Sequence, residues 1–290
     1  KRIAQIASKL VPFMAFWYLV GSFAVIVSNY ENIIPSLQSI FIHVFTPAAA
    51  VGGFLGASVA AALTRGVNRG LYSNEAGQGS APIAHASSKT ENPIEEGMVS
   101  ILEPFIDTIV ICTITGLVIL SSGVWTEKFE NKFEQSSMCY LDGTYSDSEP
   151  EDIAVLQDYI LSCSGPQAYS GKQEIVDGKL SNNAITLMHN RSVSENVIYS
   201  QEGSPFTGSV EIIEGKLNSP GISVKGDSLL LGADLTSKAF SRSLFGEFGQ
   251  YIVAIGLLLF AFSTAIAWSY YGDRATVHLF GEGWILYYRI

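Results

Sequence analysis

Four stretches of the chain are apolar and almost free of charge. Residues 10–28, 101–120 and 250–271 are each about as long as the ~20 residues that an α-helix needs to cross a bilayer. Residues 46–64 carry no charge, but they consist largely of Ala and Gly, which favours packing between helices over contact with lipid. The pattern predicts four membrane-spanning helices, of which 46–64 is an inner one, and places the shorter stretch 33–45 at the membrane interface.

Composition separates two environments within the 290 residues. The chain is 48% hydrophobic and 15% charged, which indicates a membrane protein, and its net charge of −10 disfavours a nucleic acid partner. Residues 124–249 hold 18 acidic and 9 basic side chains, whereas the rest of the chain holds 9 and 8. We therefore expect a transmembrane region at 1–123, an acidic insertion at 124–248 and a second transmembrane region at 249–290.

Basic residues outside the insertion predict the orientation of the helices. They precede the first helix, follow the second and follow the fourth: Lys1, Arg2, Lys9, Arg65, Arg69, Lys89, Arg274 and Arg289. By the positive-inside rule all of them lie on the cytoplasmic side. Four crossings then place residues 124–248 on the external face of the plasma membrane.

The insertion has the pattern of a small α+β domain. Residues 209–217 and 221–231 alternate β-branched and aliphatic residues with Gly, Pro, Asn and Asp, which predicts strands, and 151–161 predicts a short helix. Cys139 and Cys163 both fall in this external domain. A disulfide between them is one alternative, and two free thiols are the other.

Motifs of soluble enzymes are missing from the chain. It contains no HExxH, no Walker-type GxxxxGK[ST] and no GxSxG, and no two of its four histidines stand at metal-ligand spacing. The sequence therefore predicts a protein that is not an enzyme and that uses no organic cofactor.

Residues 66–86 (GVNRGLYSNEAGQGSAPIAHA) form an unusual motif directly after the second helix. Gly costs a helix about 1 kcal/mol relative to Ala, and Pro costs more, so this stretch is a poor choice for a plain helix. One interpretation is a cytoplasmic loop with turn chemistry and close packing. Arg69, Asn74 and Glu75 are candidates for a gate, formed by a salt bridge, or for a structural tether.

Two glycines, Gly52 and Gly53, mark the middle of the second helix, together with Gly56. The spacing Gly52-x-x-x-Gly56 fits a close crossing of two helices. The alternative is a break in the helix, where exposed backbone groups face a polar cavity and hold a substrate or an ion.

Ser263, Thr264 and Trp268 lie near the middle of the fourth helix. Two hydroxyls beside a large aromatic ring suit a Na⁺ ion with oxygen ligands next to an apolar wall. The alternative is a Ser/Thr pair that bonds back to its own helix, beside an interfacial Trp.

Two carboxylates, Glu103 and Asp107, lie four residues apart near the start of the third helix, so an α-helix would place them on one face. Charged side chains in a membrane helix are costly and indicate a functional site or a buried ion pair. We expect a structural or gating pair with a basic residue of the preceding loop.

With these residues the chain resembles the sodium:alanine symporter (alanine or glycine:cation symporter) family. The resemblance extends over more than half of the chain, and its segments are PFMA at 12–15, AAVGGF at 49–54, RGLYSNEAGQGSAPIAH at 69–85 and AFSTAIAWSYYGDRA at 261–275. It implies an all-α polytopic membrane protein, part of the inverted five-helix-repeat bundle of leucine-transporter-like proteins. It also implies that residues 124–248 are inserted into a loop that is short in the family.

The resemblance assigns roles to individual residues. Gly52, Gly53 and Phe54 match the discontinuous helix of the second repeat and, with Thr264 and Trp268, imply a substrate pocket. Ser263 and Thr264 match the hydroxyl ligands of a sodium site.

The function that the resemblance implies is sodium-coupled import of small neutral amino acids, alanine or glycine, by alternating access. The chain begins and ends abruptly, so we expect a C-terminal-half fragment that lacks the first repeat, with a cytoplasmic loop leading toward a missing further helix. The expected partners are the amino acid, Na⁺ and membrane lipid. The alternative is a transporter-like membrane anchor whose external domain senses a signal or binds an external partner.

Overall fold

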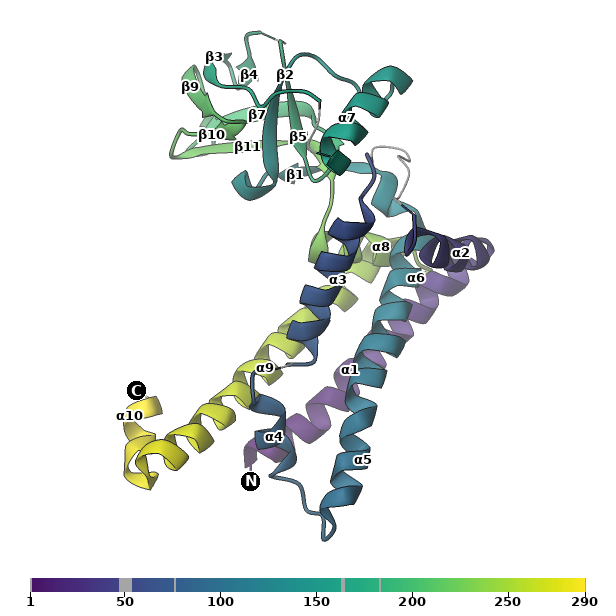
Figure 1. Cartoon of the computed structure of the whole chain (residues 1–290), viewed down its shortest axis with the longest axis vertical. Helices are drawn as coiled ribbons and strands as arrows, with labels where there is room; N and C mark the ends of the chain where they lie inside the picture. The colour runs from purple at the N-terminus through teal and green to yellow at the C-terminus, as the bar shows by residue number, and fades with distance from the viewer. Residues whose placement is uncertain (1, 47–53, 76, 163–164, 183, 290) are drawn as a thin grey trace. The chain divides into compact units, whose positions relative to one another are not determined.

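The computed structural model describes residues 2–46, 54–75, 77–162, 165–182 and 184–289 (Figure 1). Its internal contacts divide the chain into two compact units, which we describe separately. Unit 1 contains residues 1–36, 63–122 and 236–290, and unit 2 contains residues 37–62 and 123–235.

Unit 1 is helical. Its elements are α1 (Arg2–Ser28), most of α3 (Val59–Ser73), α4 (Ser80–His85), α5 (Pro93–Pro104), the π-helical segment η2 (Phe105–Ile111), α6 (Cys112–Ser122), most of α8 (Gly232–Ser241), α9 (Gly249–Phe280) and α10 (Ile285–Arg289). Helix α1 packs against α9 and α6, and α5, η2 and α6 form one uninterrupted helical stretch (Figure 1). Helix α2 (Ile33–His43), at the predicted interfacial stretch, contributes residues to both units.

Three helical stretches are long and apolar enough to cross a membrane: Lys9–Ser28, Pro93–Ser122 and Gly246–Phe280. They contain the predicted helices 10–28, 101–120 and 250–271. The second begins earlier than predicted because Asn92 caps it, accepting a hydrogen bond from Ile94 N at 3.0 Å, with Pro93 at the first helical position. Most of their large apolar side chains are exposed, which suits contact with lipid or with further protein.

The predicted helix 46–64 is wrong over residues 54–58, which are not helical; α3 begins only at Val59. Gly56 has a φ of 96°, a left-handed conformation that an α-helix cannot contain. The backbone groups of this segment bond elsewhere in unit 2: Leu55 N donates to Arg191 O at 3.0 Å, and Arg191 Nη1 donates to Gly56 O at 2.8 Å. The apolar, Gly-rich composition of this stretch is evidence for burial, but it does not by itself specify a helix.

The end of α1 lies next to the two parts of unit 1 that flank residues 123–235. Asn29 Nδ2 donates to Arg242 O at 3.0 Å, and Asn32 Nδ2 donates to Ser121 O at 2.9 Å. The predicted insertion 124–248 corresponds to residues 123–235 of unit 2, whereas residues 236–248 belong to unit 1.

Close packing joins α1 to α8 and α9 at Gly21. A Cβ at this position would lie 2.7 Å from the Phe240 ring and 2.9 Å from Ile252 Cγ2, so a larger side chain would force the helices apart.

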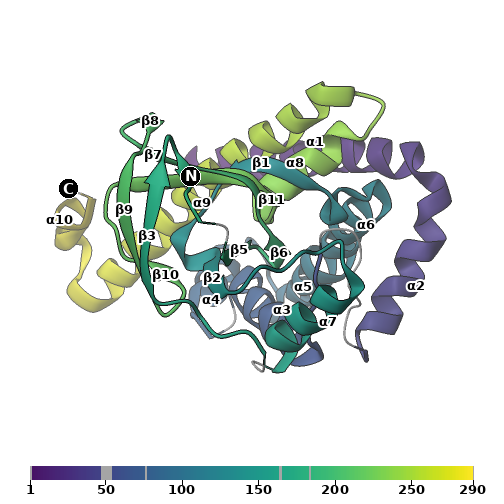
Figure 2. The ribbon, with the colours of Figure 1, turned by 90° about the horizontal axis from the view of Figure 1, so that it is seen from above.

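Unit 2 is built mainly of antiparallel strands. They are β1 (Lys128–Lys132), β2 (Met138–Asp142), β3 (Gly171–Val176), β4 (Lys179–Leu180), β5 (Ile185–His189), β6 (Ser192–Val193), β7 (Glu195–Gln201), β8 (Ser204–Pro205), β9 (Gly208–Ile213), β10 (Lys216–Leu217) and β11 (Ile222–Leu229). The strand orders of the three sheets are β1-β11-β7-β8, β10-β9-β3-β4 and β2-β5-β6. Viewed from above, β3 and β9 run side by side (Figure 2). The strands predicted at 209–217 and 221–231 are confirmed, and so is the helix predicted at 151–161, which is α7 (Pro150–Ser162).

Two tyrosines lie at the centre of the core of unit 2. Tyr140 and Tyr199 are fully buried, and their hydroxyl oxygens lie 3.0 Å apart. Burial raises the pKa of Tyr199 to about 12, so both phenols stay neutral at physiological pH. Aliphatic residues of the surrounding strands, such as Ile175, Val210 and Ile212, complete this core.

The β3–β4 and β9–β10 hairpins repeat one short pattern, EIVDGKL in the first and EIIEGKL in the second. Their turn residues, Asp177-Gly178 and Glu214-Gly215, all have φ between 48° and 75°. Positive φ at both turn positions is the geometry of a type I′ hairpin, which an acidic residue followed by Gly favours. The strands predicted at 209–217 include only the second hairpin, although the first carries the same signal in the sequence.

His189 is buried on β5 and bonded in a neutral state. It is 2% exposed, its Nδ1 lies 2.7 Å from Ser228 Oγ, and its ring stacks on Phe133 at 4.3 Å between centroids. Burial lowers its pKa to about 4, because the interior disfavours the charged imidazolium.

We predict that acid destabilises unit 2 through His189. The unfolded chain binds a proton near pH 6.5 and the folded chain only near pH 4, so stability falls as the pH drops through this window, by about 2 to 3 kcal/mol at pH 4.5. Amide hydrogen exchange of β5 and β11, corrected for intrinsic rates, measures this loss. His189→Gln keeps a polar side chain that does not titrate. Between neutral pH and pH 4.5 this variant should therefore lose about 2 to 3 kcal/mol less stability than the wild type. Equal losses of stability in the two proteins would contradict the prediction.

Candidate functional site

The motif at 66–86 forms the end of α3, a turn and α4. Its first residues are helical as far as Ser73, although Gly66 and Gly70 weaken a helix. The glycines of the turn are explained by backbone geometry, because Gly77 and Gly79 have φ of 78° and 75° and Glu75 has φ of 49°. The motif therefore builds a sharp turn in left-handed backbone.

A buried side chain links the turn to α4 by a hydrogen bond. Ser80, the first residue of α4, is buried and donates its hydroxyl to Glu75 Oε2. Arg69 is exposed and forms no ion pair with Glu75, both residues being described by the structure. The salt-bridged gate is therefore not formed in this conformation, and Glu75 instead ties the turn to α4.

The π-helical segment η2 contacts the residues at the start of the turn. In η2 the backbone opens to the wider i→i+5 spacing, which occurs mostly in short segments and often at functional sites. Pro104 precedes it and has no N–H to donate to the preceding turn, which gives the helix a local reason to change its pitch. Asn74 Nδ2 donates to Thr108 Oγ1 at 2.9 Å and to Gly70 O at 2.9 Å, and Ser73 donates its hydroxyl to Asp107 Oδ2.

Glu103 and Asp107 contact different residues of the motif. Glu103 Oε2 lies 3.4 Å from His85 Nε2, and Asp107 accepts from Ser73. The change from α- to π-helix at Phe105 falls between the two carboxylates. Their role as a structural or gating pair stays a prediction.

The three candidate residues of α9 lie in unit 1. Ser263 is buried, and its Oγ donates to Phe260 O at 2.9 Å, which is the back-bonded geometry of the alternative interpretation. Thr264 is half-buried, and Trp268 is 48% exposed with its ring 6.2 Å from that of Tyr271. Within the described part of the chain, no three His, Cys, Asp or Glu side chains are grouped to hold a metal ion. A sodium site on Ser263 and Thr264 stays a prediction.

The glycines predicted to bind substrate, Gly52 and Gly53, lie outside the described residues. Phe54 is described, and its ring meets the Trp125 ring edge-on at 5.5 Å. Phe54 belongs to unit 2, whereas Thr264 belongs to unit 1. Their common role in a pocket stays a prediction.

Sequence reasoning missed an ion pair at the end of α9. Asp273 is buried, and both of its carboxylate oxygens accept hydrogen bonds from Arg289 of α10, one of them from Nε at 3.0 Å. The Tyr288 hydroxyl occupies the space that a Cβ on Gly272 would need, so only glycine allows α10 to fold back this closely. The sequence did contain a signal for this ion pair: Asp273 lies beside a predicted spanning segment, and a carboxylate there is costly without a partner.

The predicted disulfide involves Cys163, which lies outside the described residues. Cys139 is a free thiol in the structure, 3.3 Å from the Tyr159 hydroxyl of α7. The pairing stays a prediction.

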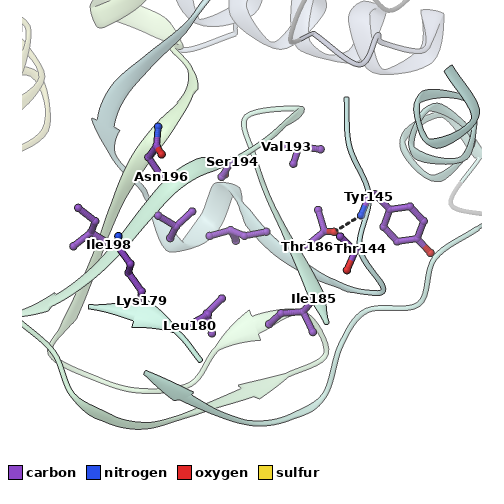
Figure 3. A pocket seen from close by; sticks show the side chains of 12 residues that line it. Thr144, Tyr145, Lys179, Leu180, Ile185, Thr186, Val193, Ser194, Asn196 and Ile198 are labelled. Carbon is purple, nitrogen blue, oxygen red and sulfur yellow. Dashed lines mark hydrogen bonds between the residues drawn. The ribbon is translucent and has the colours of Figure 1, made fainter. Parts of the chain in front are cut away.

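Unit 2 contains a separate pocket of about 690 Å³ (Figure 3). Half of its lining residues are aliphatic, and Lys179 lies at one side. Two of its polar side chains bond within unit 2: Thr186 Oγ1 accepts from Tyr145 N at 2.8 Å, and Asn196 Nδ2 donates to Asp227 Oδ2 at 2.6 Å. The buried Ser194 Oγ has no hydrogen-bond partner among the described residues. None of the predicted transport residues lines it.

Comparison with known proteins assigns the chain to a family. The sequence model of the sodium:alanine symporter family matches residues 1–144 and 213–290, which is most of the chain and includes the motif, η2 and α9. The chain belongs to the sodium:alanine symporter family. The family that we predicted from the motifs is therefore confirmed. Residues 145–212, from before α7 into β9, are left out of the match and lie within the predicted insertion.

Three relatives illustrate the family. An uncharacterized transporter of Haemophilus influenzae is 29% identical over the whole chain, which covers 42% of that protein. The sodium/alanine symporter AgcS of Methanococcus maripaludis is 29% identical over the whole chain, which covers 41% of it. The probable sodium/glutamine symporter GlnT of Bacillus subtilis is 42% identical over 43% of this chain and 25% of its own length. The chain thus spans less than half the length of these relatives. No solved structure matches it.

We predict that Asn74 and Thr108 stabilise unit 1 as a pair. Asn74→Ala and Thr108→Val each remove the same hydrogen bond, so the double variant should lose about 0.5 to 1.5 kcal/mol less than the sum of the single losses. Denaturation of the detergent-solubilised protein measures the three free energies of unfolding. Ser87→Ala, which removes an exposed bond to Ala84 O, is the control and should combine additively with either variant. Additive losses for Asn74 and Thr108 would contradict the pairing.

Proposed function

We propose that the protein is a sodium-coupled symporter that imports a small neutral amino acid, alanine or glycine, by alternating access. Family membership carries this proposal, because the matched residues include the motif, η2 and α9, which the resemblance links to transport. The names of AgcS and GlnT couple sodium to an amino acid, alanine in one and glutamine in the other. They support the coupling ion and the class of cargo, and the small neutral side chain is our proposal.

The inverted five-helix repeat belongs to this proposal. In such transporters, discontinuous helices expose backbone groups at the substrate site, and the carboxylate and ammonium of an amino acid bind there. The non-helical residues 54–58 before α3 favour the broken-helix alternative for this stretch. In the present conformation Arg191 takes up the Leu55 N–H and the Gly56 carbonyl, so a substrate that used these groups would displace Arg191.

The pocket that we propose combines Gly52, Gly53, Phe54, Thr264 and Trp268, with the hydroxyls of Ser263 and Thr264 as sodium ligands. Hydroxyl oxygens are suitable ligands for a hard cation, and the Trp ring supplies an apolar wall for a methyl-sized side chain. Ser263 can keep donating its proton to Phe260 O while the lone pairs of its hydroxyl oxygen face the ion.

We place the insertion on the external face of the plasma membrane. Ser121 and Arg242, which flank residues 123–235 along the chain, lie next to Asn32 and Asn29 at one end of α1. Lys9, Lys89 and Arg289 belong to the opposite ends of the spanning stretches, and the positive-inside rule makes that side cytoplasmic.

The alternative of a membrane anchor that presents an external sensing domain is not favoured. The family match covers the membrane helices and omits residues 145–212, so the family likeness is carried by the part that would only anchor the protein under that hypothesis.

We predict that Thr264→Ala and Trp268→Ala each lower kcat/KM for alanine at least about tenfold, which corresponds to ~1.4 kcal/mol of transition-state stabilisation. The measurement is uptake of labelled alanine and of ²²Na⁺ into proteoliposomes that contain the full-length protein. Wild-type flux of each solute should require the other.

The matched control is Trp284→Ala, which removes an exposed ring beyond the spanning stretch, packed on Phe280 and Tyr287. It should retain uptake. Alanine uptake without a sodium gradient would refute sodium coupling, and full activity of both α9 variants would refute the proposed pocket.

A further inference from the structure

An imidazole bridges two carboxylates where α4 meets α5. His85, the last residue of α4, lies with Nδ1 2.7 Å from Glu96 Oε1 and with Nε2 3.4 Å from Glu103 Oε2. Glu96 and Glu103 are seven residues apart, two helical turns, and therefore occupy the same face of α5. Both nitrogens of the ring are thus directed at acidic partners on one neighbouring helix.

The surroundings leave His85 as the cation of this cluster. Among the described residues, no Lys or Arg pairs with Glu96 or Glu103. The Ser88 side chain interacts with Glu96, and from α9, which also packs on α4, the titratable Tyr271 interacts with Glu103 and with Glu75. The side chains of His85 and Glu96 are partly shielded, at 28% and 23% exposed, whereas Glu103 is 57% exposed.

A bridge of this kind depends on a proton. A neutral imidazole carries one N–H and can donate to one carboxylate, while its other nitrogen is an acceptor that faces the second carboxylate unfavourably; the imidazolium donates from both nitrogens. The hydrogen bond to Glu96 accordingly raises the pKa of His85, and the negative charges of Glu103 and Glu96 act in the same direction.

We propose that His85, Glu96 and Glu103 form a proton-binding clamp that holds α4 against α5 and makes transport depend on cytoplasmic pH. The clamp itself stands on the geometry of unit 1, and its effect on transport rests on the proposed function. It lies at the start of the spanning stretch Pro93–Ser122, which is the cytoplasmic end in the proposed orientation.

Helix α4 connects the clamp to the rest of the motif by hydrogen bonds. Ser80, at the other end of this short helix, bonds to Glu75, and the adjacent Asn74 bonds to Thr108 of η2. The stabilisation from His85 is complete below the pH at which the unfolded imidazole titrates and is lost as the pH rises through the raised pKa of the folded state. A higher cytoplasmic pH therefore frees α4, and we expect it to accelerate the inward opening that alternating access requires.

The first test reads the proton directly and needs no transport. The purified full-length protein, labelled on its histidine rings, is titrated by NMR, and the His85 signal is assigned by its loss in His85→Gln. We expect its pKa above the ordinary value of about 6.5 and expect Glu96→Gln to lower it. A His85 pKa at or below that value, or one that Glu96→Gln leaves unchanged, would overturn the clamp.

The second test follows uptake. Initial rates of sodium-driven alanine uptake are measured at fixed external pH while the internal pH of the proteoliposomes is varied. We expect the rate to rise with internal pH in wild type and this dependence to be lost in His85→Gln. His278→Gln, which removes an exposed histidine of α9, is the matched control and should retain the wild-type profile.

The outcomes separate the two proposals. If His85→Gln keeps the pH dependence, the regulatory role of the clamp is refuted, whatever the titration shows. If wild-type protein does not take up alanine at all, the proposed function fails, whereas the NMR titration still decides whether the clamp binds the proton.

Discussion

The structure of unit 1 depends on one constraint: a polar group in a helix with largely apolar surroundings is costly unless it finds a partner within the protein, and among the described residues of this unit only the side chains of Trp17 and Ser121 are buried without one. Isolated hydroxyls satisfy it within their own helix, as Ser263 does by donating to Phe260 O. Groups that a single helix cannot satisfy bring segments together, as Asn74 does with Thr108 and Asp273 with Arg289. The motif, η2 and α10 are placed by these few bonds.

The sequence predicted those parts of the fold whose signal is local. Length and a high density of Leu, Ile, Val and Phe predicted the three spanning stretches, and β-branched runs interrupted by Gly predicted the strands near residues 209–231. The break at 54–58 escaped because Ala- and Gly-rich composition reports burial, while the helix is prevented by the left-handed Gly56 and by bonds to Arg191, 135 residues away. The π-helical turn escaped for a similar reason, since Pro104 alone does not specify its pitch.

In the candidate site, too, only the features with a local signal in the sequence could be predicted. The unusual composition of residues 66–86 was enough to single out the motif, and its glycines indeed lie in a turn with positive φ. The partners of its side chains could not be predicted, because they come from η2 and α5. Glu103 and Asp107 contact different residues of the motif, His85 and Ser73, and His85 became prominent only when both of its ring nitrogens were placed against carboxylates.

The β5–β6 turn ties the stretch that the family match omits to the segment before α3. Arg191 lies in this turn, within residues 145–212, yet it holds two backbone groups of that segment. Simple excision of residues 145–212 would leave the Leu55 N–H and the Gly56 carbonyl without these partners. A relative without this stretch would therefore need other partners for the backbone near the position of residue 55.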